Sequence, residues 1–179
     1  MKLSPKTTQP TTRIEHLAKF GANDLNDLCD ATVLAIENGG GFGWLKVPEH
    51  DVMERFWEGV LVMPSRYLFV ARLDDTICGT AQMILPSHNN QAQSHAVHIA
   101  SAFVAPWARG HNMGRKLITG MEEKAKTEGY KVINLDVRET QTEAISLFEG
   151  LGYQKIAMHP HYAEVDGKVV QGFFYYKEL

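Results

Sequence analysis

The chain has 179 residues, of which 44% are hydrophobic and 22% are charged, and its formal net charge is −3. This composition is typical of a globular protein and excludes a disordered or membrane-embedded chain, while the length favours one domain over two. The negative net charge argues against a nucleic-acid-binding protein, which would carry a basic excess.

The start of the chain is polar and lacks the apolar run of a signal peptide or membrane anchor. We therefore expect a flexible tail over residues 1–12, no association with membranes and a cytoplasmic location. A single domain is expected over residues 13–179. Its first element is predicted to be a strand over residues 13–17.

Two helices are predicted next, over residues 23–38 and 48–63, because apolar side chains recur there at helical spacing. The connection between them contains Phe42 and Trp44. We expect these two residues to line a substrate pocket, whereas Trp57, inside the second helix, is expected in the core.

The middle of the chain is typical of antiparallel pairing. Residues 67–72 and 77–85 read as two strands joined by the turn at 73–76, which predicts a hairpin. The polar residues 86–94 are expected to form an exposed connection. Residues 96–104 form the next predicted strand, which runs directly into a basic turn.

The second half predicts a helix over residues 113–128 and a strand over residues 132–137. This strand must return parallel to the one before the helix, because a helical crossover joins them. A short helix through residues 144–148 and strands over 153–158 and 170–176 complete an α/β fold with a mixed sheet covered by helices.

The turn after the strand at 96–104 has the features of an anion cradle. Amides in the first turn of a helix lack intrahelical partners and carry the positive end of the helix dipole, roughly half an elementary charge. Gly110 and Gly114 leave the backbone uncovered, and Asn112 tolerates a left-handed conformation. Nearby basic side chains add positive charge: Arg109, His111 and Arg115. The segment therefore predicts a site for a diphosphate.

Two familiar phosphate-binding motifs do not fit this segment. A P-loop needs Lys and then Ser or Thr after its last glycine, whereas Arg115 and Lys116 follow Gly114, and the dinucleotide fingerprint needs three glycines. The segment instead resembles the acyl-CoA loop of the GNAT acetyltransferase superfamily, Arg/Gln-x-x-Gly-x-Gly/Ala. Arg109 takes its first position, Asn112 stands where the first glycine usually is, and Gly114 takes the last.

The sequence downstream also resembles GNAT proteins. Their motif Asn-x-x-Ala-x-x-Leu-Tyr matches a segment in which Gln141 replaces the Asn and Phe148 replaces the Tyr. Residues 158–179 are similar to the branch that includes tabtoxin-resistance acetyltransferases. That branch acetylates small amine-bearing molecules.

The resemblance implies a three-layer α/β fold with a mixed, mostly antiparallel sheet, helices on both faces and a central pair of parallel strands that splay apart. It implies acetyl-CoA as co-substrate, without a metal, its pantetheine arm bonded to the freed strand backbone. It also implies direct acetyl transfer to the primary amine of a small molecule. The residues assigned to cofactor binding are Phe103, Val104, Arg109, Gly110, His111, Asn112, Met113, Gly114, Arg115 and Gln141.

His98 stands where many GNAT enzymes carry a Glu, and it is the candidate general base. Counting back from Val104 in steps of two would place His98 on the same face of the strand as Ala102. A histidine titrates near pH 6.5 and is mostly neutral in cells, so it can accept a proton. Packing of His98 beside the sheet is an equal alternative.

Two further residues complete the candidate catalytic set. Asp136, on the neighbouring predicted strand, is expected to orient His98 or to bind the substrate ammonium. Phe148 lacks the hydroxyl that its GNAT counterpart usually supplies to the departing thiolate, and Tyr162 is the substitute candidate.

Two other functions stay open on this sequence. One is a non-catalytic acyl-CoA-binding module, in which Asn112, Gln141 and Phe148 mark a decayed site. The other is an acetyltransferase acting on a protein lysine or amino terminus, for which a wide acidic groove is expected. A homodimer is compatible with the sequence. Cys29 and Cys78 are expected to be core thiols.

Overall fold

The computed structural model describes residues 9–39 and 43–179. Most of the expected tail, residues 1–8, and Phe42 lie outside the described residues. The elements follow the chain in this order: β1 (Thr12–Leu17), α1 (Asp24–Glu37), α2 (His50–Val62), β2 (Arg66–Leu73), β3 (Thr76–Ile84), β4 (Ala96–Val104), α3 (Met113–Thr127), β5 (Val132–Arg138), α4 (Thr142–Gly150), β6 (Gln154–Val165) and β7 (Lys168–Glu178). Within the described ranges the strands form one seven-stranded sheet in the order β1-β2-β3-β4-β5-β7-β6.

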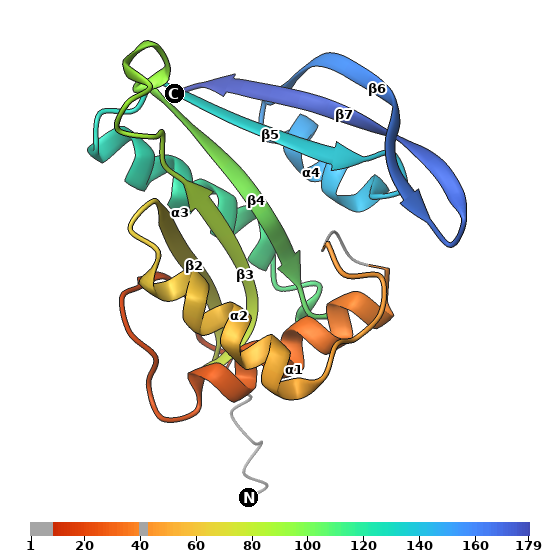
Figure 1. The fold of residues 1–179 in the computed structure, drawn as a ribbon. Helices are drawn as coiled ribbons and strands as arrows, with labels where there is room; N and C mark the ends of the chain where they lie inside the picture. Colours follow the sequence, from red (N-terminus) through yellow and green to blue (C-terminus); the bar gives the residue numbers. More distant parts are fainter. Residues whose placement is uncertain (1–8, 40–42) are drawn as a thin grey trace, which may run out of the picture.

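The sheet is mixed, as the sequence predicts. β4 and β5 are parallel, because α3 carries the chain back between them, and the other neighbouring strands are antiparallel. Helices cover both faces: α1 and α2 lie on one side of the β1 to β4 half, while α3 and α4 lie on the other side of the sheet (Figure 1). The predicted three-layer α/β architecture is confirmed.

Two buried clusters lie on opposite faces of the sheet. The first joins α3 and α4 to the sheet and includes Leu117 and Phe148. The second lies under α1 and α2 and includes Leu28 and Trp57. Trp57 is fully buried and donates a hydrogen bond from Nε1 to Thr32 Oγ1 at 3.1 Å, so its predicted place in the core is confirmed.

The hairpin of β6 and β7 runs farther than the sequence predicts. β6 continues through Pro160 to Val165, although a proline usually argues against a strand. β6 is the terminal strand of the sheet, and a strand edge that pairs with no neighbour needs no backbone N–H at that position. The predicted end of this strand at residue 158 is therefore wrong.

An irregularity in β4 changes which side chains share a face. Thr80 of β3 lies opposite Phe103, and Gln82 lies opposite Ala100. Between these two pairs β4 advances three residues while β3 advances two. The extra residue forms a β-bulge, and Ser101 within it has a φ of 52°. A bulge of this kind breaks the regular alternation of side chains along the strand.

The bulge corrects the expected position of His98. Val97 packs in the cluster under α3, whereas Phe103 packs in the cluster under α1 and α2, although a regular strand would put both on one face. His98 therefore points to the α1 side of the sheet, while Val104 packs toward α3. The expectation that His98 shares a face with Ala102 and Val104 is wrong, because the sequence carries no signal for the bulge.

A buried ion pair ties α1 to β2. The Arg72 guanidinium donates to both Asp24 oxygens, at 2.7 Å and 2.9 Å, and to Glu15 Oε1 at 2.5 Å. The bond from Arg72 lowers the pKa of Asp24 below its ordinary value of 3.8, although burial acts in the opposite direction. The charged form of Asp24 therefore contributes to stability.

We expect Asp24→Asn to lower the free energy of unfolding at pH 7 by about 2–3 kcal/mol, since a buried guanidinium loses its charged partner. Urea denaturation measures the loss. Because the folded pKa of Asp24 is depressed, its contribution is complete above pH 3.8 and is lost as the pH falls through the folded pKa, so the difference should shrink in acid. Asp51→Asn, which breaks an exposed pair with Arg55, is the control and should cost below about 0.5 kcal/mol.

Candidate active site

The predicted cradle has the backbone conformation of an anion site. Gly110 has a φ of 82°, and Asn112, the residue before α3, lies in the left-handed region with φ 59° and ψ 25°. The first helical hydrogen bond joins Lys116 N to Asn112 O at 3.1 Å. The amides of Met113 and Gly114 therefore precede the helical ladder, and in the described chain the Asn112 side chain does not cap them. Asn112 thus adopts the left-handed conformation that this residue type tolerates.

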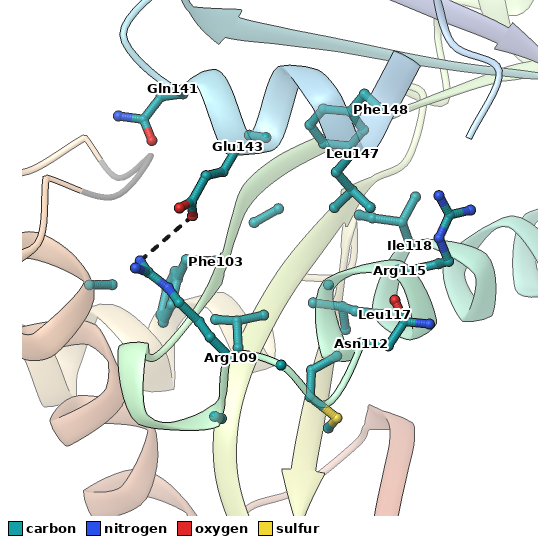
Figure 2. Close-up of a pocket in the computed structure, with 18 residues that line it drawn as sticks. Phe103, Arg109, Asn112, Arg115, Leu117, Ile118, Gln141, Glu143, Leu147 and Phe148 are labelled. Atoms are coloured by element: carbon teal, nitrogen blue, oxygen red, sulfur yellow. Dashed lines mark ion pairs between the residues drawn. The ribbon is translucent and has the colours of Figure 1, made fainter. Parts of the chain in front are cut away.

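A cavity of about 440 Å³ opens between this turn, the end of β4 and the start of α4 (Figure 2). With one exception, the residues predicted to bind the cofactor line it: Phe103, Val104, Arg109, Gly110, Asn112, Met113, Gly114, Arg115 and Gln141. The exception is His111, whose Nδ1 lies 3.3 Å from Ala108 O. This contact braces the turn, and a role of His111 in cofactor binding stays a prediction.

Arg109 and Glu143 face each other across the mouth of this cavity (Figure 2). Their nearest charged atoms, Nη2 and Oε2, are 4.0 Å apart, and the side chains are 44% and 82% exposed. An ion pair this long and this exposed contributes little to stability. Arg109 is therefore available to a phosphate at small cost.

Gln141 connects this cavity to the segment just after α1. It precedes α4, and its Nε2 donates to Gly39 O, just after α1, at 2.6 Å. Gln141 also lines a second cavity of about 440 Å³. The two cavities share Ala102, Gln141, Ala144 and Phe148.

The parallel strands separate where the cavities meet. Pairing of β4 with β5 begins at Ala96 and Val132 and ends at Ile99 and Leu135. Beyond that point the two strands diverge, as Figure 1 shows. The splayed central pair that the resemblance implies is therefore present, and Ala102 of β4, beyond the last paired residues, lines both cavities.

The second cavity brings the three candidate catalytic residues together. His98, on β4, places Nε2 3.0 Å from Asp136 Oδ1. Tyr162, on β6, donates its hydroxyl to Asp136 Oδ2. Asp136 reaches both because side chains on β5 alternate, and those of Ile133, Leu135 and Val137 point toward the α3 face instead.

The protonation states of Asp136 and Tyr162 follow from their contacts. The hydrogen bond with His98 lowers the pKa of Asp136, burial opposes this, and the bond from Tyr162 lowers the pKa further. Burial raises the pKa of Tyr162 above its ordinary value, and the bond to Asp136 raises it further. Asp136 is therefore an ionised acceptor for both neighbours, and the Tyr162 proton is held toward Asp136.

Some residues of this cavity were not singled out from the sequence. Arg138, which also lines it, could have been found by counting two positions along β5 from Asp136. Glu164, on β6, carries no comparable signal. In the predicted pocket loop, Leu45 lines the cavity, whereas Trp44 packs against Phe56 with ring centroids 5.0 Å apart.

Two features of residues 9–39 and 43–179 bear on the other predictions. No helix there is long and apolar enough to cross a membrane. In the same ranges, no cluster of His, Cys, Asp and Glu side chains could hold a metal ion. The absence of a metal from the reaction stays a prediction.

The chain matches known proteins over most of its length. The model of the Acetyltransferase (GNAT) family matches residues 32–153, more than half of the chain. Over 128 residues the chain is 52% identical to the protein described as "Uncharacterized N-acetyltransferase in hisH-hisA intergenic region" from Azospirillum brasilense, a match that covers 72% of this chain and 76% of that protein.

Solved structures show the same fold. Ribosomal-protein-alanine N-acetyltransferase from Brucella melitensis superimposes with a TM-score of 0.76 at 20% identity, over 93% of this chain and 99% of that one. A phosphinothricin acetyltransferase from Sinorhizobium meliloti, solved with acetyl-CoA, gives a TM-score of 0.74 at 17% identity, over 96% and 89% of the two chains. The chain belongs to the GNAT family and is an acetyltransferase.

Proposed function

We propose that this protein moves the acetyl group of acetyl-CoA directly to the primary amine of a small molecule. The observation that supports this most is the meeting of two cavities where β4 and β5 separate. One cavity holds the cradle, and the other holds His98 and Asp136. A thioester bound from one side can therefore meet an amine bound from the other.

The cradle side fits acetyl-CoA. The free amides before Lys116 and the positive end of α3 suit the diphosphate, and Arg109 can turn from Glu143 toward it. The backbone between β4 and β5 offers hydrogen-bonding groups to the pantetheine arm, and Gln141 lies beside that passage. The S. meliloti relative, solved with acetyl-CoA, supports the same use of the fold. Bound there, acetyl-CoA supplies the activated acetyl group.

The acceptor side must remove a proton. A lysine-like amine has a pKa about three units above neutral, so supplying it as the free base costs about 4 kcal/mol. With Nε2–H of His98 donating to Asp136, the lone pair lies on Nδ1 and can take the proton from the attacking amine. The carboxylate of Asp136 then stabilises the positive ring, and Tyr162 holds that carboxylate in place.

Release of the thiol is the second proton step. Phe148, which lines both cavities, packs against Tyr153 with ring centroids 5.4 Å apart and offers no hydroxyl. Tyr162 remains our proposed donor, although its proton is engaged by Asp136 and its pKa is raised. A thiol near pKa 8.5 also leaves without full protonation, which limits the demand on Tyr162.

We expect no covalent acyl-enzyme. Burial raises the pKa of Cys29 and of Cys78 to about 11, so neither supplies a thiolate at neutral pH. Incubation with acetyl-CoA alone should leave the intact mass unchanged, as judged by mass spectrometry after denaturation. A stoichiometric gain of one acetyl group, retained on one peptide and discharged by an amine, would contradict direct transfer.

A thiol-release screen tests the whole proposal, with small amines, aminoglycosides and peptides as acceptors. Release with small amines alone supports it. Release with peptides alone would favour a protein acceptor, the type named in the B. melitensis relative. Binding of CoA without release for any amine would favour a sensing module. The second cavity carries Arg138 as well as Asp136 and Glu164, which is unlike the wide acidic groove expected for a protein substrate.

A single domain over residues 13–179, a cytoplasmic location, a homodimer and a likeness to the tabtoxin-resistance branch stay predictions. β1 begins at Thr12, one residue before the expected start of the domain.

A further inference from the structure

Gly172 occupies a buried position on β7 where a side chain would collide with the candidate site. It lies opposite Arg138 of β5 and His159 of β6. A Cβ atom built there would overlap the ring of Tyr162, with Cγ as the nearest atom. Gly172 is not among the glycines with positive φ, so its backbone is open to any residue. The neighbouring ring, and not the conformation, is what demands glycine.

The ring of Tyr162 reaches this place because β6 is irregular. From His159 to Ala163, β6 advances four positions while β7 advances two, from Gly172 to Val170. The additional residues turn Tyr162 inward from an edge strand that is otherwise largely exposed. Phe174 supports the ring from the side, with centroids 6.1 Å apart and planes at 84°.

We infer that Gly172 is a positioning residue, whose missing side chain seats the Tyr162 ring on the β7 backbone so that its hydroxyl reaches Asp136. Asp136 is in turn hydrogen-bonded to His98, so the position of the Tyr162 ring affects the proposed base through two hydrogen bonds. The catalytic part of this inference rests on the proposed function. The placement of the Tyr162 ring by Gly172 concerns only the geometry of the Tyr162, Asp136 and His98 side chains. It can be tested without catalytic turnover.

The test is a titration of the Asp136 carboxyl by ¹³C NMR in Gly172→Ala. The added methyl group displaces the ring, the hydrogen bond from Tyr162 is lost, and we expect the pKa of Asp136 to rise, as it should in Tyr162→Phe. The other titratable or charged groups facing this cavity are His98, Arg138 and Glu164, which the substitution leaves in place. We expect kcat to fall by up to about a hundredfold, as for a misplaced catalytic group, with KM for acetyl-CoA unchanged.

A double-mutant cycle separates displacement of the Tyr162 ring from a general effect of Gly172→Ala on packing. In a Tyr162→Ala background there is no ring to displace, so Gly172→Ala should change neither the Asp136 pKa nor kcat further. Gly59→Ala is the control, because a Cβ there meets no atom within 4 Å and should leave the Asp136 titration unchanged.

If Gly172→Ala folds, two results would overturn the inference: a wild-type Asp136 pKa in that variant, or the same effect of the substitution with and without the ring. If Gly172→Ala does not fold, the inference requires that adding Tyr162→Ala restores folding, and failure of the double variant would overturn it. The titration needs no acceptor amine, so it stands even where no transfer is detected.

Discussion

Replacing His98 by Gln should lower kcat/KM by about a hundred- to ten-thousandfold, the usual contribution of a positioned general base. Gln can still donate a hydrogen bond to Asp136, as His98 Nε2 does at 3.0 Å, so the site should keep its packing. It has no basic nitrogen, and the amine must then lose its proton to water. Binding of acetyl-CoA, measured by calorimetry, should be unchanged because His98 lines only the acceptor cavity.

The pH profile distinguishes a base from a residue that only supports the site. Protonation of the free amine lowers kcat/KM in acid for both enzymes, and a general base should add a further acid limb in the wild type that His98→Gln lacks. His88→Gln, in an exposed connection between β3 and β4, is the matched control and should behave as wild type. Activity of His98→Gln within about threefold of wild type would remove His98 as the base, because a positioned base is worth at least about a hundredfold.

The cradle could be predicted from sequence because its physics is local. An apolar strand, a glycine-bearing basic turn and an amphipathic helix within residues 96–127 are enough to expose amides at a helix start. The parallel pairing of β4 with β5 followed from the helical crossover alone. Both inferences need only neighbours along the chain, and the structure agrees with them.

The candidate catalytic group depends on irregularities that sequence patterns do not reveal. Ser101 has a positive φ without being a glycine or asparagine, so nothing marked the bulge that turns His98 to the other face. Pro160 indicated the end of a strand, yet β6 continues past it and delivers Tyr162 to Asp136. Gly172 matters only through a contact between residues on neighbouring strands.

In the proposed function, the bulge lets one strand, β4, serve both substrates. Val104 packs toward α3, beside the cradle, while His98 lies on the opposite face with Asp136. A regular β4 would have put both side chains on the same side of the sheet, and the base would then face the cradle side of the sheet. The splay beyond Ile99 opens the passage between the two faces. In the proposed function, bulge and splay together let the base and the thioester meet at one point.

The second large effect is expected from substitutions in the turn that forms the cradle. Arg109→Ala combined with Gly110→Pro should weaken acetyl-CoA binding by about a hundredfold or more, through loss of one charged phosphate contact and of the amide geometry. Proline fixes φ near −65°, whereas Gly110 needs a φ of 82°, so the turn before Asn112 must rearrange. Calorimetry with acetyl-CoA gives the affinity, and thermal unfolding shows whether the fold survives.

The control introduces proline at a glycine that has a similar φ but lies outside the cradle. Gly129, just after α3, has a φ of 87°, close to that of Gly110, and lies at the opposite end of the helix. Gly129→Pro should therefore lower stability at least as much while leaving acetyl-CoA affinity within about threefold of wild type, since strain of this kind acts locally. If both variants lose affinity equally, the loss reflects general destabilisation. If neither does, the diphosphate binds elsewhere, because the amides before Lys116 would then contribute nothing to its affinity.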